Sequence, residues 1–281
     1  MLMSDVNEFH WSVDNYSDLY SSSMGTTVNA GGSTHTKGSE AELIAGAALT
    51  EDCYYMAIKF FGGGESNTIA SYLADIVVDP AGGTSWSVLI PNLVVDSPHY
   101  LYGGAHFVFP LFVKAGSSVG FKHQCSIASR ALRCAIKLYG KPSKPEFMRY
   151  GHTVEAIGVN TGTSLGVSIT TGASNAKGDW ASVGTTTQDN WFWQMGIGLP
   201  DTTCGASFAY YLDMSAGDAS NKRVCMDNVL FIKDNTEQAG KIAISEMPPI
   251  KQVPSGETVY IRGAHSLTAD SGLHAAAYGV R

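Results

Sequence analysis

The residues in this sequence that could carry chemistry are acidic, because a pair of carboxylates can act as acid and base in cleaving a glycan. Asp75 and Asp79 flank three apolar residues, and Asp213 and Asp218 lie in a polar stretch. A chain with 25 acidic residues offers many such pairs by chance. We therefore expect no catalytic residue, and a glycan-cleaving enzyme is the weakest of three functional hypotheses.

Most recognised catalytic and cofactor-binding motifs are missing from the chain. It contains no HExxH pair, no phosphate loop and no dinucleotide fingerprint. The run Gly62-Gly63-Gly64 is not followed by a helix with a lysine, so we interpret it as a turn. The eight histidines are scattered, and the five cysteines have no metal-ligand spacing. We therefore expect no metal ion and no cofactor.

An internal repeat organises the sequence, with the two copies separated by about 140 residues. Gly116 matches Gly256 (256 − 116 = 140), and Phe121 matches Ile261 at the same spacing. Further anchors, in the same order, are Lys37-Gly38 with Lys177-Gly178, Asp52 with Asp189, Asn92-Leu93 with Asn228-Val229, and the closing Tyr139 with Tyr278. These ordered matches favour a tandem duplication over the alternative of two unrelated β domains.

Short strands and frequent turns predict an all-β fold. β-Branched and aromatic runs predict strands at residues 54–61, 69–78, 85–95, 107–113, 118–125 and 133–139 in the first copy, and at 164–171, 191–199, 209–214, 223–232, 242–245, 258–262 and 273–278 in the second. No amphipathic helix separates them, so we expect two tandem antiparallel jelly-roll-like β-sandwich domains. The predicted organisation is an N-terminal arm (1–24), a first domain (25–140), a proline-containing linker (141–150) and a second domain (151–281).

The repeat also separates aromatic residues expected in the core from those expected near solvent. Trp191 and Trp193 align with Tyr54 and Met56 with a period of two, so we expect this face to be core in both copies.

Two other tryptophans have charged counterparts. Trp180 aligns with Glu40, and Trp86 aligns with Lys222 or Arg223. An aromatic residue at such a position is expected near solvent, and an exposed ring offers a flat apolar face to a sugar. The candidate glycan contacts are Trp180, Trp86, Tyr100 and Tyr102. A partly exposed packing role is the alternative for each of them.

The first 24 residues have no recognisable counterpart in the second copy. They carry Phe9, Trp11, Tyr16 and Tyr20 among acidic and polar residues. Exposed aromatic residues need a surface that covers them. Two alternatives are open: an arm that anchors the chain in an assembly, or a segment that packs on its own first domain.

Charge and hydropathy disfavour several classes of partner. The net charge is −7 and lysine and arginine do not cluster, so we expect no nucleic-acid partner. The N-terminal stretch lacks the features of a secretory signal and no segment reads as a membrane span, so we expect no membrane insertion. A hairpin between Cys125 and Cys134 would allow a disulfide, and the alternative is buried reduced thiols of a protein folded in a cytoplasm.

Three segments of the first copy resemble phage virion proteins. They are Asn92 to Val95 (NLVV), Phe109 to Ser126 (FPLFVKAGSSVGFKHQCS) and Ala135 to Gly140 (AIKLYG), and the second copy resembles them more weakly. The resemblance implies a subunit of a tailed-phage or phage-like particle, such as a head spike, a decoration protein, or a tail or baseplate appendage. Other virion proteins and further copies of the chain are the implied partners, and the implied location is the virion, assembled in the host cytoplasm.

The leading hypothesis is a non-enzymatic virion structural component, anchored through its N-terminal part with the second domain displayed outward. The alternative is a receptor-binding module that recognises a host surface polysaccharide. The sequence leaves open which particle component this is, its oligomeric state and the identity of any glycan.

Overall fold

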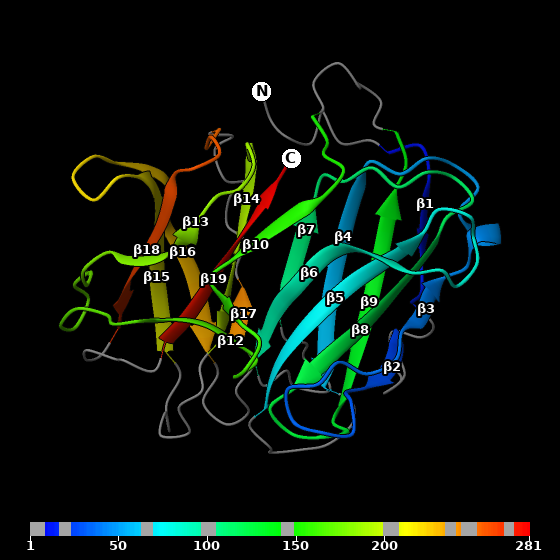
Figure 1. Cartoon of the computed structure of the whole chain (residues 1–281), viewed down its shortest axis with the longest axis horizontal. Helices are drawn as coiled ribbons and strands as arrows, with labels where there is room; N and C mark the ends of the chain where they lie inside the picture. The colour runs from blue at the N-terminus through cyan, green and yellow to red at the C-terminus, as the bar shows by residue number, and fades with distance from the viewer. Residues whose placement is uncertain are drawn as a thin grey trace.

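The computed structural model describes residues 9–16, 24–62, 70–96, 105–141, 149–198, 208–233, 240–242, 252–266 and 273–281. Within these residues the chain is built from antiparallel strands, and its one helical element is a short 3-10 turn, η2 (Gly46–Ala48). No helix in this described part is long and apolar enough to cross a membrane. Two β-sandwiches lie side by side, the first at the right of Figure 1 and the second at the left.

The described residues of the first sandwich form nine strands. They are β1 (Ser12–Asp14), β2 (Thr26–Asn29), β3 (Ala41–Ile44), β4 (Tyr55–Gly62), β5 (Ser71–Asp79), β6 (Ser87–Asp96), β7 (His106–Phe109), β8 (Ser118–Cys125) and β9 (Ala131–Tyr139). One sheet has the order β2-β9-β4-β7, with β1 also paired to β9, and the other has the order β3-β8-β5-β6. The eight strands β2 to β9 in this order form a jelly roll, and β1 adds a fifth strand to the first sheet.

The second sandwich repeats this arrangement. Its strands are β10 (Val154–Ile157), β11 (Val159–Asn160), β12 (Leu165–Ile169), β13 (Ala181–Thr185), β14 (Phe192–Gly198), β15 (Phe208–Gly217), β16 (Lys222–Lys233), β17 (Gly240–Ile242), β18 (Thr258–His265) and β19 (Leu273–Val280). In one sheet of the described residues, β10, β12 and β14 all pair with β19. The other sheet has the order β13-β18-β15-β16-β17. The predicted all-β fold of two tandem antiparallel sandwiches is therefore confirmed.

Register shows how closely the two copies correspond. Ala41 lies opposite Phe121 on the first β3/β8 ladder, and Ala181 lies opposite Ile261 on the second β13/β18 ladder. Both ladders then shift register at the same place, one residue further along. Each copy also has an asparagine with positive φ in a strand bulge, Asn92 of β6 at 51° and Asn228 of β16 at 52°. The anchors Phe121 with Ile261 and Asn92 with Asn228 therefore occupy equivalent places in the two sandwiches.

One anchor, the pairing of Tyr139 with Tyr278, is wrong by two residues. Tyr54 N–H donates to Tyr139 O, and at the equivalent position Trp191 N–H donates to Val280 O, both at 2.9 Å. Val280 is therefore the structural counterpart of Tyr139. The two tyrosines share an identity but not a position, because Tyr278 has a separate task between the sandwiches.

The described part of the predicted arm is a strand of the first sandwich. Ser12 pairs with Tyr139 at the edge of β9, as Val154 of β10 pairs with Val280 of β19. This segment therefore has a counterpart in the second copy, contrary to the sequence prediction. The two were not matched in the sequence because edge pairing uses backbone groups, which almost any side chains permit.

The predicted hairpin between Cys125 and Cys134 does not form. The two cysteines lie on β8 and β9, which belong to opposite sheets of the first sandwich. Both are buried with free thiols, as are Cys53 and Cys225, while Cys204 lies outside the described residues. Burial raises the pKa of the Cys134 thiol and that of Cys125, so these groups stay protonated and unreactive.

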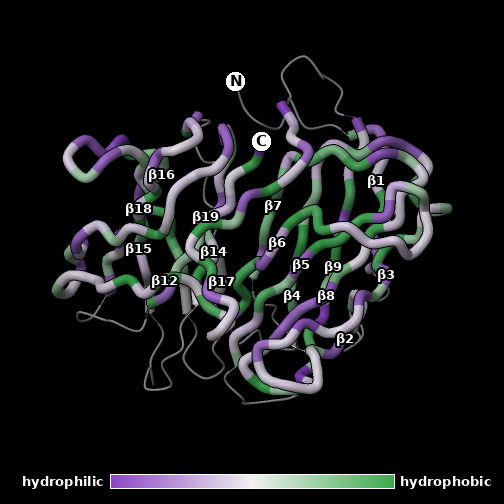
Figure 2. Tube along the Cα trace, in the orientation of Figure 1, coloured by the Kyte–Doolittle hydropathy of each residue, from purple (hydrophilic) through white to green (hydrophobic). Residues whose placement is uncertain are grey.

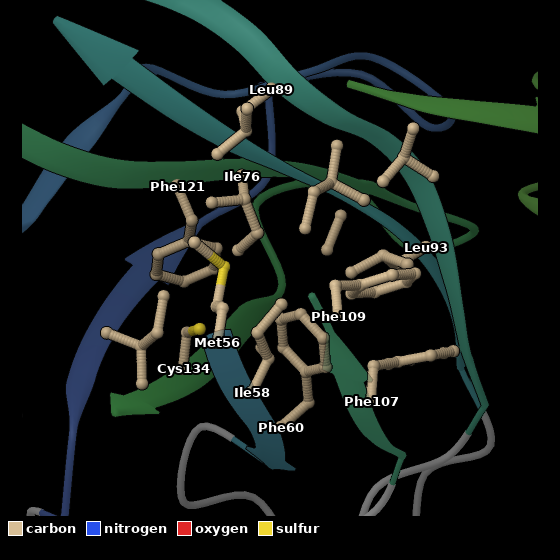
Figure 3. Packing of buried hydrophobic residues seen from close by; sticks show 14 of the residues in the cluster. Met56, Ile58, Phe60, Ile76, Leu89, Leu93, Phe107, Phe109, Phe121 and Cys134 are labelled. Atoms are coloured by element: carbon tan, nitrogen blue, oxygen red, sulfur yellow. The ribbon is translucent and has the colours of Figure 1, made fainter. Parts of the chain in front are cut away.

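The core of the first sandwich consists of inward-facing residues from both sheets. Met56, Ile58 and Phe60 of β4 point toward Ile76, Phe121 and Phe107, as Figure 3 shows. Their period of two places the alternate residues outside, as expected for a strand with one buried face. Trp193 and Met195 belong to the second core. Trp191, which is also buried, joins the first cluster instead, and Tyr54 is only half-buried.

The first core continues into the second sandwich. Val154, Phe192, Ala276, Tyr278 and Val280 pack in the same buried cluster as the residues of the first sandwich. Figure 2 shows hydrophobic segments along the strands where the two sandwiches meet and hydrophilic ones in the outer hairpin between β15 and β16. The two sandwiches are therefore joined by a shared apolar core as well as by the linker.

Tyr278 occupies the centre of this junction. Its side chain is fully buried, its ring meets those of Phe107 and Phe109 edge-on at 5.6 and 6.5 Å, and its hydroxyl reaches the backbone of β6. The hydroxyl accepts from Val94 N–H at 2.7 Å and donates to Asn92 O at 2.9 Å. One side chain therefore fills the gap between the edge strands β6 and β7 and satisfies two polar groups of β6.

Glycine lets the facing strand come close enough for this contact. A Cβ on Gly196 of β14 would lie 3.0 Å from the Tyr278 ring and 3.3 Å from Val94 Cβ. A side chain at this position would push the second sandwich away from β6.

We expect Tyr278→Phe to lower the free energy of unfolding by about 1–3 kcal/mol, because Val94 N–H and Asn92 O lose a buried partner while the ring remains. Urea unfolding followed by fluorescence measures the change. Tyr211→Phe is the matched control, since Tyr211 is 39% exposed. Equal stability of the two variants would contradict the role of the hydroxyl.

Two histidines with lowered pKa values, the buried His123 and the half-buried His106, predict a loss of stability in acid. His123 is fully buried, its Nε2 lies 2.9 Å from Val28 O, and burial lowers its pKa. Burial and the nearby Lys59 lower the pKa of His106 from 6.5 to about 4. Between these two values the unfolded chain binds protons that the folded chain does not, so stability falls as pH falls.

Replacing His106 by Gln should therefore flatten the decrease in stability between pH 6.5 and 4.5 by about 1 kcal/mol per pH unit. Unfolding free energies measured by urea titration at several pH values give the slope for both proteins. His152→Gln, at an exposed position, serves as the control. Parallel slopes for wild type and His106→Gln would refute this assignment.

Candidate functional site

A buried carboxylate organises the outer face of the first sandwich. Asp75 of β5 accepts a hydrogen bond from Lys37 Nζ at 2.6 Å and another from the Asn92 backbone N–H at 2.8 Å. Lys37 Nζ also donates to Asn92 Oδ1 at 2.8 Å and to Leu73 O at 3.3 Å. This Lys–Asp–Asn cluster ties the β2–β3 connection to β5 and to the bulge of β6.

The second sandwich has the same cluster. Asp213 accepts from Lys177 Nζ and, at 2.8 Å, from the Asn228 N–H, and Lys177 Nζ donates to Asn228 Oδ1 at 2.8 Å. Burial acts against ionisation of Asp213, but the bonds from Lys177, Asn228 and Arg262 outweigh it and lower its pKa. Because both copies carry the cluster in one geometry, we assign it to holding the fold.

The other two acids that suggested catalysis hold turns. Asp79 accepts backbone N–H groups of Ala81, Gly83 and Ser85 at 2.8–3.0 Å. Asp218 accepts those of Ser220 and Asn221 at 2.7 Å. These bonds lower the pKa of both carboxyl groups, so neither is suited to donate a proton near neutral pH.

Each sandwich has a groove at the equivalent place. In the first it lies between β2 and the segment that enters β3, and in the second between β12 and the segment that enters β13. The first groove has a volume of about 680 Å³ and is lined by residues 27–32 and 37–41. The second has a volume of about 520 Å³ and is lined by Ser168, residues 170–172 and residues 177–181. Both volumes lie in the range of small-ligand pockets. The two grooves share their backbone path and differ in the side chains on it.

The largest difference is in the wall of the groove. In the first sandwich Glu40 forms an ion pair with Lys122, with Nζ and Oε1 2.7 Å apart. In the second, Trp180 replaces Glu40 and Arg262 replaces Lys122. The Arg262 guanidinium lies 4.4 Å from the centre of the Trp180 ring, and its Nε donates to Asp213 Oδ2 at 2.9 Å. An ion pair has thus become a cation–π pair anchored on a buried carboxylate.

A second exchange lies beside the first on the outer faces. Trp86, just before β6, lies so close to Gly120 of β8 that a Cβ on Gly120 would come within 3.2 Å of the indole. At the equivalent places of the second sandwich Lys222 Nζ lies 4.7 Å from the centre of the Tyr260 ring. Trp86 is half-buried over a glycine, which agrees with the packing role held open for it.

The structure does not bring the four predicted glycan contacts into one site. Trp180 and Trp86 lie on the outer faces of different sandwiches, and Tyr100 and Tyr102 lie outside the described residues. Trp180 is the one of them that lines a groove found in the described part of the chain.

The aromatic residues predicted to anchor an arm contact the first sandwich where they are described. The Phe9 ring lies 4.9 Å from the ring of Tyr139, and Trp11 O accepts from Gly140 N–H at 2.8 Å. Tyr16 is half-buried, and burial and the nearby Tyr139 raise its pKa to about 12. Phe9, Trp11 and Tyr16 therefore pack on the chain's own first domain. Tyr20 lies outside the described residues.

Sequence reasoning missed Arg262 and the groove residues. The repeat did contain a signal for Arg262, because Lys122 precedes it by 140 residues just as Glu40 precedes Trp180. Taken together, the differences between Glu40 and Trp180 and between Lys122 and Arg262 would have indicated that two neighbouring positions changed jointly. No group of three or more His, Cys, Asp or Glu side chains within the described residues is arranged to hold a metal ion.

Comparisons with known proteins add little to this geometry. No family model and no curated protein matches the chain. A solved tandem pair of CBM22 domains from Paenibacillus barcinonensis Xyn10C aligns at 9% identity over 98% of this chain and 90% of its own, with a TM-score of 0.28. A peptide-N4-(N-acetyl-β-D-glucosaminyl)asparagine amidase aligns at 12% identity over 91% and 96%, with a TM-score of 0.24. At these values neither likeness says what this chain binds.

We expect Asp213→Asn to lower the free energy of unfolding by about 2–3 kcal/mol, since Lys177 and Arg262 would lose their shared charged acceptor. Asp179→Asn, at an exposed neighbouring position, should change it by less than about 0.5 kcal/mol. Chemical denaturation measures both variants. A destabilisation of Asp213→Asn no larger than that of Asp179→Asn would refute the structural role of the cluster.

Proposed function

We propose that this chain is a non-enzymatic structural component of a phage or phage-like particle. The observation that carries the non-enzymatic part is the engagement of the candidate acids: Asp75 and Asp213 hold the Lys–Asp–Asn clusters, and Asp79 and Asp218 hold turns. Each of these carboxylates accepts hydrogen bonds that fix it in place. None of the four is therefore poised as one member of a catalytic pair.

The resemblance to virion proteins supports the particle setting. Its segments now have structural explanations, since the turn at Ala115 is held by Asp52, whose Oδ1 accepts the Ala115 N–H at 2.8 Å. Asp189 accepts the Ser255 N–H in the same way and at the same distance in the second copy. Such segments maintain a jelly roll, a fold that particle proteins use widely. In this proposal the N-terminal part of the chain anchors it and the second sandwich faces outward.

A second candidate function is glycan binding by the second sandwich. The observation that favours it is the partly exposed Trp180 in the wall of a groove of about 520 Å³, where the first sandwich has Glu40. Two domains that share a backbone fold but differ in the side chains of a groove wall can bind different ligands. An outward-facing particle subunit with such a groove would serve as a receptor-binding module.

A partition assay tests both candidates. Labelled protein is mixed with host cell envelopes and, separately, with particles stripped of this subunit. We expect saturable binding to the stripped particles, because a structural component recognises its neighbours. Failure to bind them would contradict the structural proposal. Envelope binding that free surface polysaccharide competes away would support the glycan candidate.

A further inference from the structure

We infer that the groove of the second sandwich binds an uncharged sugar unit and that the equivalent groove of the first sandwich does not. This inference rests on the glycan-binding candidate and deepens it. It assigns a chemical class of ligand, a set of contacting residues and a stoichiometry of one site per chain. The inference is based on the duplication, because the two grooves have the same backbone course but different side chains in their walls.

The floor of the second groove is rigid. Gly178 lies so close to the β12 end that a Cβ would come within 2.2 Å of Thr170 O, and Gly172 similarly faces Ala176 O at 2.6 Å. Lys177 is held by Asp213 and Asn228, and Gly178 N–H donates to Gly263 O at 2.9 Å. A groove with a fixed floor loses little conformational entropy when a ligand enters.

The Trp180 ring is held in place before a ligand arrives. Arg262 lies over the ring at 4.4 Å and is itself fixed by its bond to Asp213. The indole supplies an apolar surface, and the exposed Ser168, Thr170 and Asp179 supply hydrogen-bonding groups around it. An apolar wall next to several polar groups matches a sugar ring, whose face presents C–H groups and whose rim carries hydroxyls.

Charge favours an uncharged ligand. The ammonium of Lys177 and the guanidinium of Arg262 are both already paired with Asp213. Asp179 adds an exposed carboxylate at the groove. An acidic sugar would therefore meet a carboxylate without gaining an unpaired cation from these residues.

The first groove lacks the features that favour a sugar. Its wall is the Glu40–Lys122 ion pair, with both side chains partly exposed, and a ligand placed on it would remove water from two charges. None of the described residues that line this groove is aromatic. The same backbone therefore presents a binding wall in one copy and a hydrated ion pair in the other.

Calorimetric titration of the full chain with uncharged hexasaccharides of glucose, xylose and mannose, and with an oligogalacturonate of the same length, tests the inference. We expect one uncharged oligomer to bind at one site per chain, more tightly than the oligogalacturonate. Trp180→Ala should weaken this binding by at least about tenfold. Trp86→Ala is the matched control and should leave it unchanged.

Thr170→Arg provides a second variant, because an exposed residue on the groove floor can be replaced without removing a packed ring. It should also weaken binding, and circular dichroism checks that each variant is folded. The first sandwich offers a gain-of-function test: Glu40→Trp combined with Lys122→Arg should raise the stoichiometry from one site to two.

The outcomes separate the site from the function. Sugar binding that survives both Trp180→Ala and Thr170→Arg overturns this groove while the glycan-binding candidate stands. Tighter binding of the oligogalacturonate overturns the assignment of an uncharged ligand. If none of the oligosaccharides binds the wild-type chain, the inference is overturned. The envelope partition assay then decides independently whether the glycan-binding candidate survives.

Discussion

A buried carboxylate in each sandwich is the constraint on which the rest of the structure depends. Asp75 and Asp213 lie inside a sheet face where an unpaired charge would be costly, so each must have bonded partners. The partners come from a lysine in one connection and from the backbone of a bulge in another strand. Satisfying one charge therefore fixes the path of two separate segments, and with them the floor of each groove.

The bulge created in this way also shapes the junction between the sandwiches. Asn92 bonds to Lys37 through its side chain, while its carbonyl accepts the Tyr278 hydroxyl. The same strand of the first jelly roll is thus held by its own lysine and by the second jelly roll. A shared apolar core surrounds these bonds, so the duplicated domains depend on each other for burial.

With the scaffold held by the buried clusters, the outer positions were able to diverge. Glu40 and Lys122 correspond to Trp180 and Arg262, and Gly120 corresponds to Tyr260. In the first copy the cation Lys122 pairs with the carboxylate of Glu40. In the second copy the cation Arg262 lies over the aromatic ring of Trp180. The proposed division of labour follows from this: both copies keep the fold, and one of them presents a wall suited to a ligand.

The sequence by itself determined the all-β class, the duplication and most strands, including the first-copy strand at residues 118–125, because alternating burial and turn residues act locally. Anchors such as Lys37 with Lys177 were readable because buried charges and bulges require particular residues at particular places. Only the tertiary structure decided that β1 pairs as β10 does, that Cys125 and Cys134 lie on opposite sheets, and that Tyr278 spans the junction. These facts depend on contacts between segments far apart in the chain, where backbone pairing and shape decide and residue identity leaves little trace.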